Sequence, residues 1–383
     1  MIDAAEVRHR TLELIDAHRA DDEVAFLDAQ YLAGLAWIQF PEGEGGLGVS
    51  PKLQEAADTE LDAAGRRYPW MRNPMGIGMV GPAIAAHGTP EQRAHLRRIF
   101  TAEELWCQLF SEPGAGSDVA TLATRAARDG DEWVIDGQKV WTSLAHAASY
   151  GLLLARTDPT VPKHQGLTAF IVDMHAPGVE VRPLRQMSGD SHFSEVYFTG
   201  ARVPDSSRVG EIGEGWRVAV TTLMNERVSI GGTVAPRGSG PIGAAVATWQ
   251  KLGDHDPARR DQLLRLWTDA EVLRLGNMRA QQLRERGTPG PEGSVLKLGG
   301  ALLSQRIASF TVDLLGPAGL LFDYDVATGR EDPVHALLSG QSSTIAGGTS
   351  EIMRNILGER MLGLPGEPRA DKGIPWSEIP KGF

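Results

Sequence analysis

The chain is built from three stretches that differ in the spacing of their apolar residues. Residues 1–104 show helical spacing, as at Val7, Leu12, Leu14 and Ile15. Residues 105–208 instead show short apolar runs separated by Asp-Gly, Asp-Pro, Pro-Gly or Ser-Gly turns, and helical spacing returns over 209–362. The middle runs predict strands at 105–111, 122–128, 132–136, 149–156, 167–173, 179–184 and 194–203.

This order of elements predicts an α+β protein with three regions. An N-terminal helical domain is expected at 1–104 and a C-terminal helical bundle at 209–365. Between them, many short strands with tight turns predict an antiparallel barrel or sandwich domain at 105–208. Residues 366–383 are rich in Pro, Gly and charge, so they are expected to form an irregular tail.

Local signals refine the helical regions. The run PEGEGGLGVSP at 41–51 predicts a loop, and Ser50-Pro51 begins the next helix. Residues 76–86 predict a buried helix that Pro82 should kink or interrupt. Thr89-Pro90 predicts the start of a helix running toward Phe100. GTPGPEG at 287–293 predicts a loop between two helices.

Composition narrows the class of protein. The 383 residues carry a formal net charge of −11, which argues against a nucleic-acid surface. Cys107 is the only cysteine, so an intramolecular disulfide and a thiolate metal cluster are both excluded. No signal peptide is visible and no apolar run is long enough to span a bilayer. These features predict a cytoplasmic protein with no membrane partner and no metal.

Two segments carry candidate chemistry. CQLFSEPGAGSD, from Cys107 to Asp118, begins like a strand and then turns at glycines that let a ligand approach the main chain. DEWVIDGQKVWTS, at 131–143, predicts a hairpin with an Asp-Gly turn and ends in Trp141, Thr142 and Ser143. An aromatic ring beside two hydroxyls can stack on a planar ring and hydrogen-bond its edge.

On these residues the chain resembles the acyl-CoA dehydrogenase family. SEPGAGSD and GQKVWTS match the two flavin-contacting signatures of that family in order and spacing. The resemblance extends from LAWIQFPEGEGGLG near the start to GGTSEIMRNILGERMLGLP near the end. It implies a fold with a small barrel between two helical regions, FAD as the cofactor, and oxidation of an acyl-CoA thioester to its trans-2-enoyl-CoA. In that reaction a carboxylate removes the α-proton and hydride passes to flavin N5.

The resemblance offers two positions for the carboxylate base. The usual position, in a Tyr-Glu-Gly-Thr-like segment, is Gly347 here, and glycine has no side chain to act. The second position, on an earlier helix, falls on Glu226 in TTLMNERVSIGG, followed by Arg227. Leu223 and Ile230 share the helix face of residue 226, and an apolar face raises the pKa of a carboxylate. The hypothesis is therefore that Glu226 is the catalytic base, although glutamates on helices are usually solvated or paired.

The resemblance also implies supporting residues. Arg227 and Gly347 are expected beside the substrate, and Ser117 at the boundary between flavin and thioester. The expected cofactor-binding residues are Gln108, Phe110, Ser111, Gly116, Ser117, Trp141, Thr142, Ser143, Gly316, Gly319, Gly348, Thr349 and Glu351. Gly316 and Gly319 lie in LLGPAGLL, which resembles the loop that reaches the cofactor diphosphate from a neighbouring subunit. Thr349 or Ser350 has a simpler interpretation as a helix N-cap.

The subgroup most similar in these segments acts on steroid side chains and other bulky acyl groups, and Gly347 would leave room for a wide substrate. Expected partners are an electron-transferring flavoprotein and further subunits, in a homo- or hetero-oligomer that is a dimer or tetramer. Residues 232–262 lack the Arg-Gln-Phe-Gly-like motif that contacts the partner's flavin in many members. One alternative is therefore a structural subunit of a heteromer without its own turnover. Another is an acyl-CoA oxidase, although those enzymes usually carry an extra C-terminal helical region.

Overall fold

A computed structural model describes residues 2–66, 69–230, 234–253, 256–285, 292–322, 332–369 and 371–380. For residues 70, 226–230, 284 and 285 it describes the backbone alone. The chain forms two compact units. Unit 1 contains Met1–Leu184, His192–Asn225 and Asp371–Phe383, and unit 2 contains Arg185–Ser191 and Glu226–Ala370. None of the described helices is long and apolar enough to cross a membrane.

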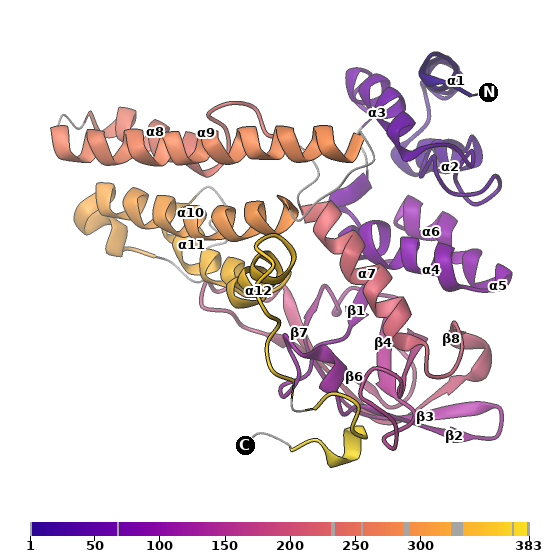
Figure 1. Cartoon of the computed structure of the whole chain (residues 1–383). Coiled ribbons are helices and arrows are strands. Elements are labelled where there is room, and N and C mark those ends of the chain that lie inside the picture. The colour runs from indigo at the N-terminus through magenta and orange to yellow at the C-terminus, as the bar shows by residue number, and fades with distance from the viewer. Residues whose placement is uncertain are drawn as a thin grey trace. The chain divides into compact units, whose positions relative to one another are not determined.

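The predicted order of helices, strands and helices is observed (Figure 1). The N-terminal helices are α1 (Ala4–Ala17), α2 (Glu23–Leu32), α3 (Gln54–Ala63), α4 (Gly81–His87), α5 (Pro90–Arg93) and α6 (His95–Thr101). Thr89 caps α5 through a reciprocal pair of hydrogen bonds with Gln92, as its sequence signal predicts. The regular helix predicted at 76–86 is interrupted just before Pro82: a π-helical turn at Gly76–Val80 gives way to α4, and Pro82 occupies the first turn of α4, where its missing N–H is tolerated.

The middle strands form one eight-stranded sheet in the order β6-β7-β3-β2-β4-β5-β8, with β1 paired to β4. The strands are β1 (Trp106–Leu109), β2 (Arg125–Asp129), β3 (Glu132–Ser143), β4 (Tyr150–Arg156), β5 (Leu167–Asp173), β6 (Val179–Leu184), β7 (Phe193–Pro204) and β8 (Arg208–Val209). The pairing is mixed rather than wholly antiparallel, because β1 and β2 both pair with β4 in parallel. The α+β class is as predicted.

The predicted hairpin turn at Asp136-Gly137 is wrong. β3 continues through this point and β7 pairs with both of its halves, with a register shift between Ile135 and Gly137. A Cβ atom on Gly137 would lie 2.5 Å from Thr124 Oγ1, so glycine is needed for a close backbone approach rather than for a turn. The tight turn lies earlier, where Asp129 pairs with Glu132 around Gly130.

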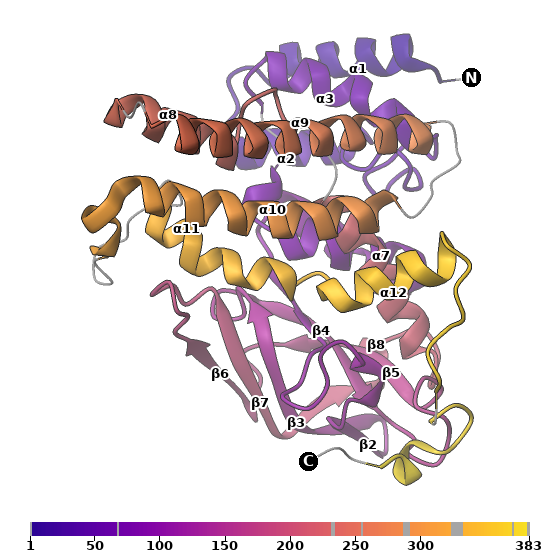
Figure 2. The same cartoon turned by 60° about the vertical axis from the view of Figure 1, so that its left-hand side comes forward.

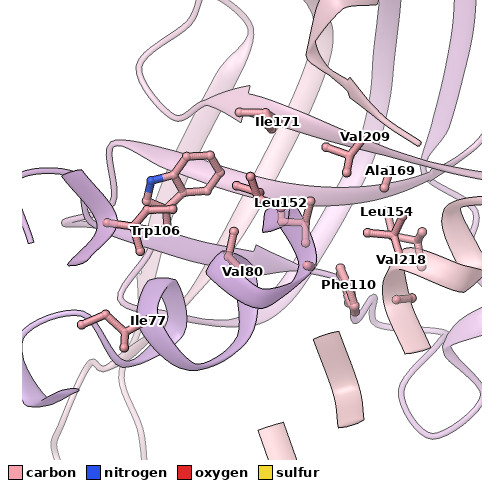
Figure 3. Packing of buried hydrophobic residues seen from close by; sticks show 14 of the residues in the cluster. Ile77, Val80, Trp106, Phe110, Leu152, Leu154, Ala169, Ile171, Val209 and Val218 are labelled. Carbon is pink, nitrogen blue, oxygen red and sulfur yellow. The ribbon is translucent and has the colours of Figure 1, made fainter. Parts of the chain in front are cut away.

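The sheet is covered by apolar side chains on both faces. Along β4, Leu152 and Leu154 belong to one buried cluster, whereas Leu153 and Ala155 belong to another. Alternation along a strand sends successive side chains to opposite faces, so β4 is buried on both. The first cluster also contains residues of the N-terminal helices and of α7 (Gly215–Ile230), as Figure 3 shows for Ile77, Val80 and Val218.

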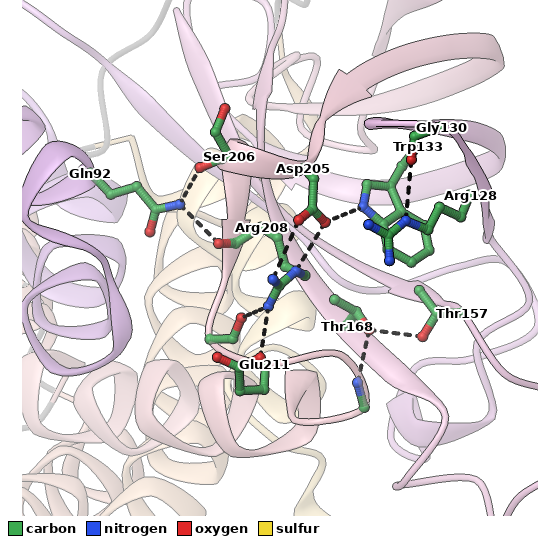
Figure 4. A network of polar contacts seen from close by, with 12 residues as sticks. Gln92, Arg128, Gly130, Trp133, Thr157, Thr168, Asp205, Ser206, Arg208 and Glu211 are labelled. Carbon is green, nitrogen blue, oxygen red and sulfur yellow. Dashed lines mark hydrogen bonds and ion pairs between the residues drawn. The ribbon is translucent and has the colours of Figure 1, made fainter.

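Polar contacts also join the helices of unit 1 to its sheet (Figure 4). The buried Gln92 amide donates to the backbone carbonyls of Ser206 and Arg208, at 2.8 and 2.9 Å. Asp205 accepts from Arg208 and from the Trp133 indole N–H. These hydrogen bonds satisfy carbonyls and side chains between β7 and β8 and connect helix α5 to the sheet.

Unit 2 is a helical bundle around α10 (Glu292–Leu315). The helices α8 (Pro241–Leu252) and α9 (Pro257–Glu285) contribute Ile242 and Leu266 to a buried cluster that also contains Ile307 and Phe310 of α10. In Figures 1 and 2, α9 and α10 lie side by side. The shorter helices α11 (Pro333–Ser339) and α12 (Ser350–Arg360) also contact α10. The predicted loop at 287–293 lies mostly outside the described residues.

We expect Gly137→Ala to lower the free energy of unfolding by about 3 kcal/mol, since the new methyl group overlaps Thr124 and the backbone has φ of +152°. Gly130→Ala is the matched control, because it has positive φ but open space around it and should cost about 1 kcal/mol. Urea denaturation of both variants measures the difference. Equal losses would contradict the bulge as the reason for Gly137.

Candidate active site

The two candidate segments meet in unit 1, at the end of β1. The Val140 N–H of β3 donates to the Ser111 carbonyl over 2.9 Å. The Lys139 ammonium donates to the Phe110 carbonyl at 3.0 Å and to Glu112 Oε1 at 2.8 Å. Residues about thirty positions apart in the sequence are thereby joined side by side.

Lys139 and Glu112 form a buried ion pair, because Lys139 is fully buried and Glu112 nearly so. Glu112 also accepts from the backbone N–H groups of Ala123 and Thr124, at 2.7 and 2.9 Å. Its carboxylate therefore closes the loop between residues 112 and 124, and that loop contains the whole glycine turn. Such a pair is stable only when its hydrogen bonds are satisfied, as they are here.

The pair perturbs both pKa values. Burial alone would raise the pKa of Glu112, but the Lys139 ammonium and hydrogen bonds from Lys139, Thr124 and Ala123 outweigh burial and lower the pKa. Burial lowers the pKa of Lys139 to about 8, against the opposing charge of Glu112. Geometry supports the ionised form of both groups at neutral pH, since the ammonium has two oxygen partners within 3.0 Å.

The glycine turn after Glu112 is open on one side. Gly114, Gly116 and Ser117 are exposed, and a Cβ atom on either glycine would meet nothing within 4 Å. Ala115 is held by mutual backbone hydrogen bonds with Glu112 and is buried. The turn thus has a fixed base and an accessible edge of main chain, which suits a polar ligand.

Trp141 has an unusual backbone for its type. Its φ is +59°, and the register of β3 against β7 shifts between Lys139 and Thr142. A non-glycine residue in this region is strained, and such residues cluster at functional sites. The bulge turns the Trp141 side chain outward, so that 61% of it is exposed, with Phe193 edge-on at 6.1 Å.

The hydroxyls that follow Trp141 differ in burial. Ser143 is half-buried, whereas Thr142 is buried opposite Ser194 of β7. Thr142 Oγ1 and Ser194 Oγ form no hydrogen bond with the described residues. Buried hydroxyls normally have partners, and these two lie next to the exposed indole in the sequence and in the β3–β7 pairing.

The predicted residues on β1 and directly after it have different surroundings. The Phe110 ring is buried in the cluster beneath the helices (Figure 3), so its side chain is part of the core. The carbonyls of Phe110 and Ser111 both accept hydrogen bonds from β3. Gln108 is half-buried on β1. Direct cofactor contacts of these residues stay predictions.

Unit 2 contains the GGTSE segment. Thr349 is the N-cap of α12, and its hydroxyl accepts from the Ile352 N–H at 3.2 Å, as the simpler interpretation holds. The Gly348 carbonyl accepts from the Lys297 ammonium of α10.

Gly347 and Gly348 have φ of +67° and +98°. Glu351 is exposed and pairs with Arg354. A side chain at 347 would be strained, which gives a backbone reason for glycine there.

Gly316 and Gly319 lie on the turn Gly316–Leu320 at the end of α10. Gly316 has φ of +55°, typical of a glycine that ends a helix. A Cβ atom on Gly319 would lie 2.7 Å from the Val312 carbonyl oxygen, so packing alone requires this glycine. Their cofactor role therefore stays a prediction with a structural alternative.

Glu226 and Arg227 lie on helix α7, where the chain passes from unit 1 to unit 2 after Asn225. Their side chains lie outside the part that the structure describes. Leu223, three residues before Glu226, packs against the apolar cluster of unit 1. The backbone thus continues as a helix through residue 226, as the sequence predicts.

Glu112 and Lys139 lie within the two candidate segments, but neither residue was predicted to have a role. The signal was available, because Lys139 is a lysine in an apolar, alternating strand and Glu112 precedes a Pro-Gly turn. A buried lysine needs an anionic partner.

Family models match most of the chain. The middle domain of acyl-CoA dehydrogenases matches residues 107–201 and their C-terminal domain matches residues 213–362. The chain belongs to the acyl-CoA dehydrogenase family. This confirms the predicted oxidoreductase class, and a flavin is the cofactor that the family implies.

Similar proteins of known name are also acyl-CoA dehydrogenases. FadE34 of Mycobacterium tuberculosis is 43% identical over 326 residues, which cover 84% of this chain and 43% of FadE34. The chain thus spans less than half of that acyl-CoA dehydrogenase. IpdE1 of the same species is 38% identical over 353 residues, covering 88% of this chain and 86% of IpdE1.

Solved structures match the fold of this chain over almost its whole length. The ChsE4–ChsE5 complex from Mycobacterium tuberculosis matches with a TM-score of 0.70 and 31% identity, covering 95% of this chain and 97% of that one. The Tcur3481–Tcur3483 steroid ACAD matches with a TM-score of 0.73 and 28% identity over the same shares. Both structures are complexes of two different proteins by their names.

The described residues fit a flavin. An exposed, outward-turned indole suits stacking on a planar ring system, and Ser143 offers a hydroxyl beside it. The open edge of the Gly114–Gly116 turn offers main-chain polar groups where a side chain would block them.

We expect Lys139→Met to lower the free energy of unfolding by about 3–5 kcal/mol, because Glu112 would keep a buried charge without its partner. Adding Glu112→Gln should restore part of this loss, giving a coupling of about 2 kcal/mol or more in a double-mutant cycle. The control is Arg182→Met, which breaks an exposed pair with Glu180 and should change stability little. Additive losses for residues 112 and 139 would contradict the coupling.

Proposed function

We propose that the protein is an FAD-dependent acyl-CoA dehydrogenase that forms the trans-2-enoyl-CoA from a bulky acyl-CoA. The observation that supports this most strongly is the junction of the two flavin-type segments at the buried Lys139–Glu112 pair, with Trp141 turned outward beside it. Membership of the family supplies the reaction class. The identity of FAD rests on the match of both signatures.

The proposed base is Glu226. It removes the α-proton of the thioester, which is weakly acidic, so the base needs close placement and a raised pKa. Two observations support the assignment: helix α7 continues through residue 226, and the other family position, Gly347, is held in a left-handed backbone that disfavours any side chain. The product of this step is a carboxylic acid on Glu226 and an enolate on the thioester.

The other proposed site residues bind and orient the thioester and the flavin. Main-chain N–H groups near Ser117 are suited to hydrogen-bond the developing enolate oxygen, since their loop is fixed by Glu112 before substrate arrives. The exposed Trp141 indole would stack on the flavin ring system and exclude water from it. When bound, FAD supplies the electron sink that takes up the β-hydrogen as hydride.

The proposed substrates carry a wide acyl group such as a steroid side chain. The name of the Tcur3481–Tcur3483 steroid ACAD supports this, as does the glycine at position 347. The same comparison supports a hetero-oligomer, because both similar structures pair two different proteins. An electron-transferring flavoprotein is the proposed acceptor, by analogy with the family.

Glu226→Gln should slow flavin reduction by acyl-CoA at least about 10³-fold while leaving flavin content unchanged, because the amide cannot take the proton. Anaerobic stopped-flow absorbance measures the rate. Glu214→Gln is the control, since it makes the same change at a half-exposed residue just before the same helix. Rapid reduction by the Glu226 variant would refute the assignment.

Substrate width is tested by comparing kcat/KM for straight short-chain acyl-CoAs with that for ring-bearing acyl-CoAs. The ring-bearing compounds should be preferred by about tenfold or more, since burial of each extra apolar group adds binding energy only where the pocket has room. Activity confined to short straight chains would contradict a wide pocket.

A further inference from the structure

The segment Asp371–Pro380 belongs to unit 1, although it follows the helical bundle in sequence. Its backbone pairs with the β4–β5 loop: the Trp376 N–H donates to the Val161 carbonyl and the Ser377 N–H to the Pro159 carbonyl, both at 2.9 Å. Figures 1 and 2 show this yellow end of the chain beside the sheet. We call residues 371–380 the C-terminal strap.

The strap contacts the turn that directly follows Ser117. Val119–Thr121 is a 3₁₀ turn closed by the Asp118 carbonyl, and the carbonyls of Ala120, Thr121 and Leu122 all accept hydrogen bonds from side chains. The Arg156 guanidinium donates to the carbonyls of Ala120 and Leu122, at 2.6 and 3.1 Å. The carbonyl between them, of Thr121, accepts from the Trp376 indole N–H at 3.0 Å.

Trp376 also covers Arg156. The guanidinium carbon lies 4.4 Å from the centroid of the indole, and Arg156 is buried. A cation over an indole face is attracted to it, more strongly where water is excluded. One strap side chain thus supports the turn twice, by its own hydrogen bond and by fixing the arginine that holds the neighbouring carbonyls.

Lys163 adds a second connection between strap and turn. Its ammonium pairs with Asp118 at 2.6 Å and also with Asp371 of the strap, and its side chain is mostly buried. Asp118 is the last residue of the glycine segment, immediately after Ser117. The first residue of the strap therefore reaches Asp118, at the start of the turn, through Lys163, and Trp376 in the middle of the strap binds Thr121, at its end.

The opposite side of the same loop is fixed by Glu112, which accepts from Ala123 and Thr124. The exposed glycine turn is thus connected to the buried ion pair through Glu112 and to the strap through Asp118 and Thr121. A loop with high glycine content has many alternative conformations, so each fixed end reduces the entropy lost when a ligand binds.

We propose that the C-terminal strap is a positioning element of the active site, in which Trp376 and Asp371 hold the Ser117 turn in the conformation that binds the acyl-CoA thioester. The inference rests on the proposed function, since that assigns the turn to the thioester. No strap residue touches substrate in this proposal, and all of them act through Asp118, Thr121 and Arg156.

The test uses the flavin-loaded protein with three strap variants. Trp376→Ala removes the ring and the hydrogen bond, and Trp376→Phe keeps a ring over Arg156 without the N–H. Asp371→Asn removes the charge that pairs with Lys163. Glu378→Gln is the matched control: it makes the same type of change within the strap, at an exposed residue.

The first readout is amide hydrogen exchange, which needs no catalysis. Exchange of the Thr121 and Leu122 amides, which close the 3₁₀ turn, should rise about tenfold in Trp376→Ala and Asp371→Asn and remain unchanged in Glu378→Gln. Trp376→Phe should lie between, because it retains the ring. Unchanged exchange in all variants, or an equal rise in the control, overturns the proposal.

The second readout is the Kd for acyl-CoA, with flavin content and kcat measured alongside. Loss of one strap contact should weaken acyl-CoA binding about fivefold, with kcat within about twofold and flavin content unchanged. Faster exchange with unchanged acyl-CoA affinity also overturns the proposal, because the strap would then be a brace without a role at the site. Failure of the parent protein to bind or oxidise any acyl-CoA would instead refute the proposed function.

Discussion

The buried pair of Lys139 and Glu112 is the interaction on which the rest of the candidate site depends. It joins a strand that ends in a glycine turn to a strand that ends in an outward tryptophan. Removing two charges from water is costly, and the cost is offset only because carbonyl and amide partners satisfy both groups. An apolar pair could stabilise the sheet equally well. It could not bind the main chain on both sides of the turn at once.

Much of the fold follows from sequence pattern alone, and the exceptions have physical causes. The order of helices and strands and the cap at Thr89 follow from periodicity and local hydrogen bonding. Two Asp-Gly pairs, at Asp129 and Asp136, have the same turn chemistry, yet only the first makes a turn. The second pair makes no turn because β7, a strand distant in sequence, pairs with β3 on both sides of it. Local signals contain no information about that partner.

The sequence predicts which residues belong to the candidate site better than it predicts how they are arranged in space. Family signatures identify Trp141 and the glycine turn, but the positive φ of Trp141 depends on a bulge that no local pattern announces. The ion pair was missed because neither of its members resembles a reacting group. The tail was predicted to be irregular from its composition, whereas residues 371–380 make specific backbone hydrogen bonds with the β4–β5 loop and a side-chain hydrogen bond with the Thr121 carbonyl. Composition reports the absence of periodic structure, which is different from the absence of order.

The return of residues 371–380 to unit 1 also has a consequence for the order of synthesis. Unit 1 is assembled from three separate stretches of the chain, and the last of them is made after the whole of unit 2. Until Trp376 has left the ribosome, the Thr121 carbonyl and the face of Arg156 lack their partner. The sheet can form early, but the turn after Ser117 gains its contacts with the strap late. A nascent chain therefore lacks these contacts until the bundle has been made, and proteolytic removal of the strap would remove them from the mature protein.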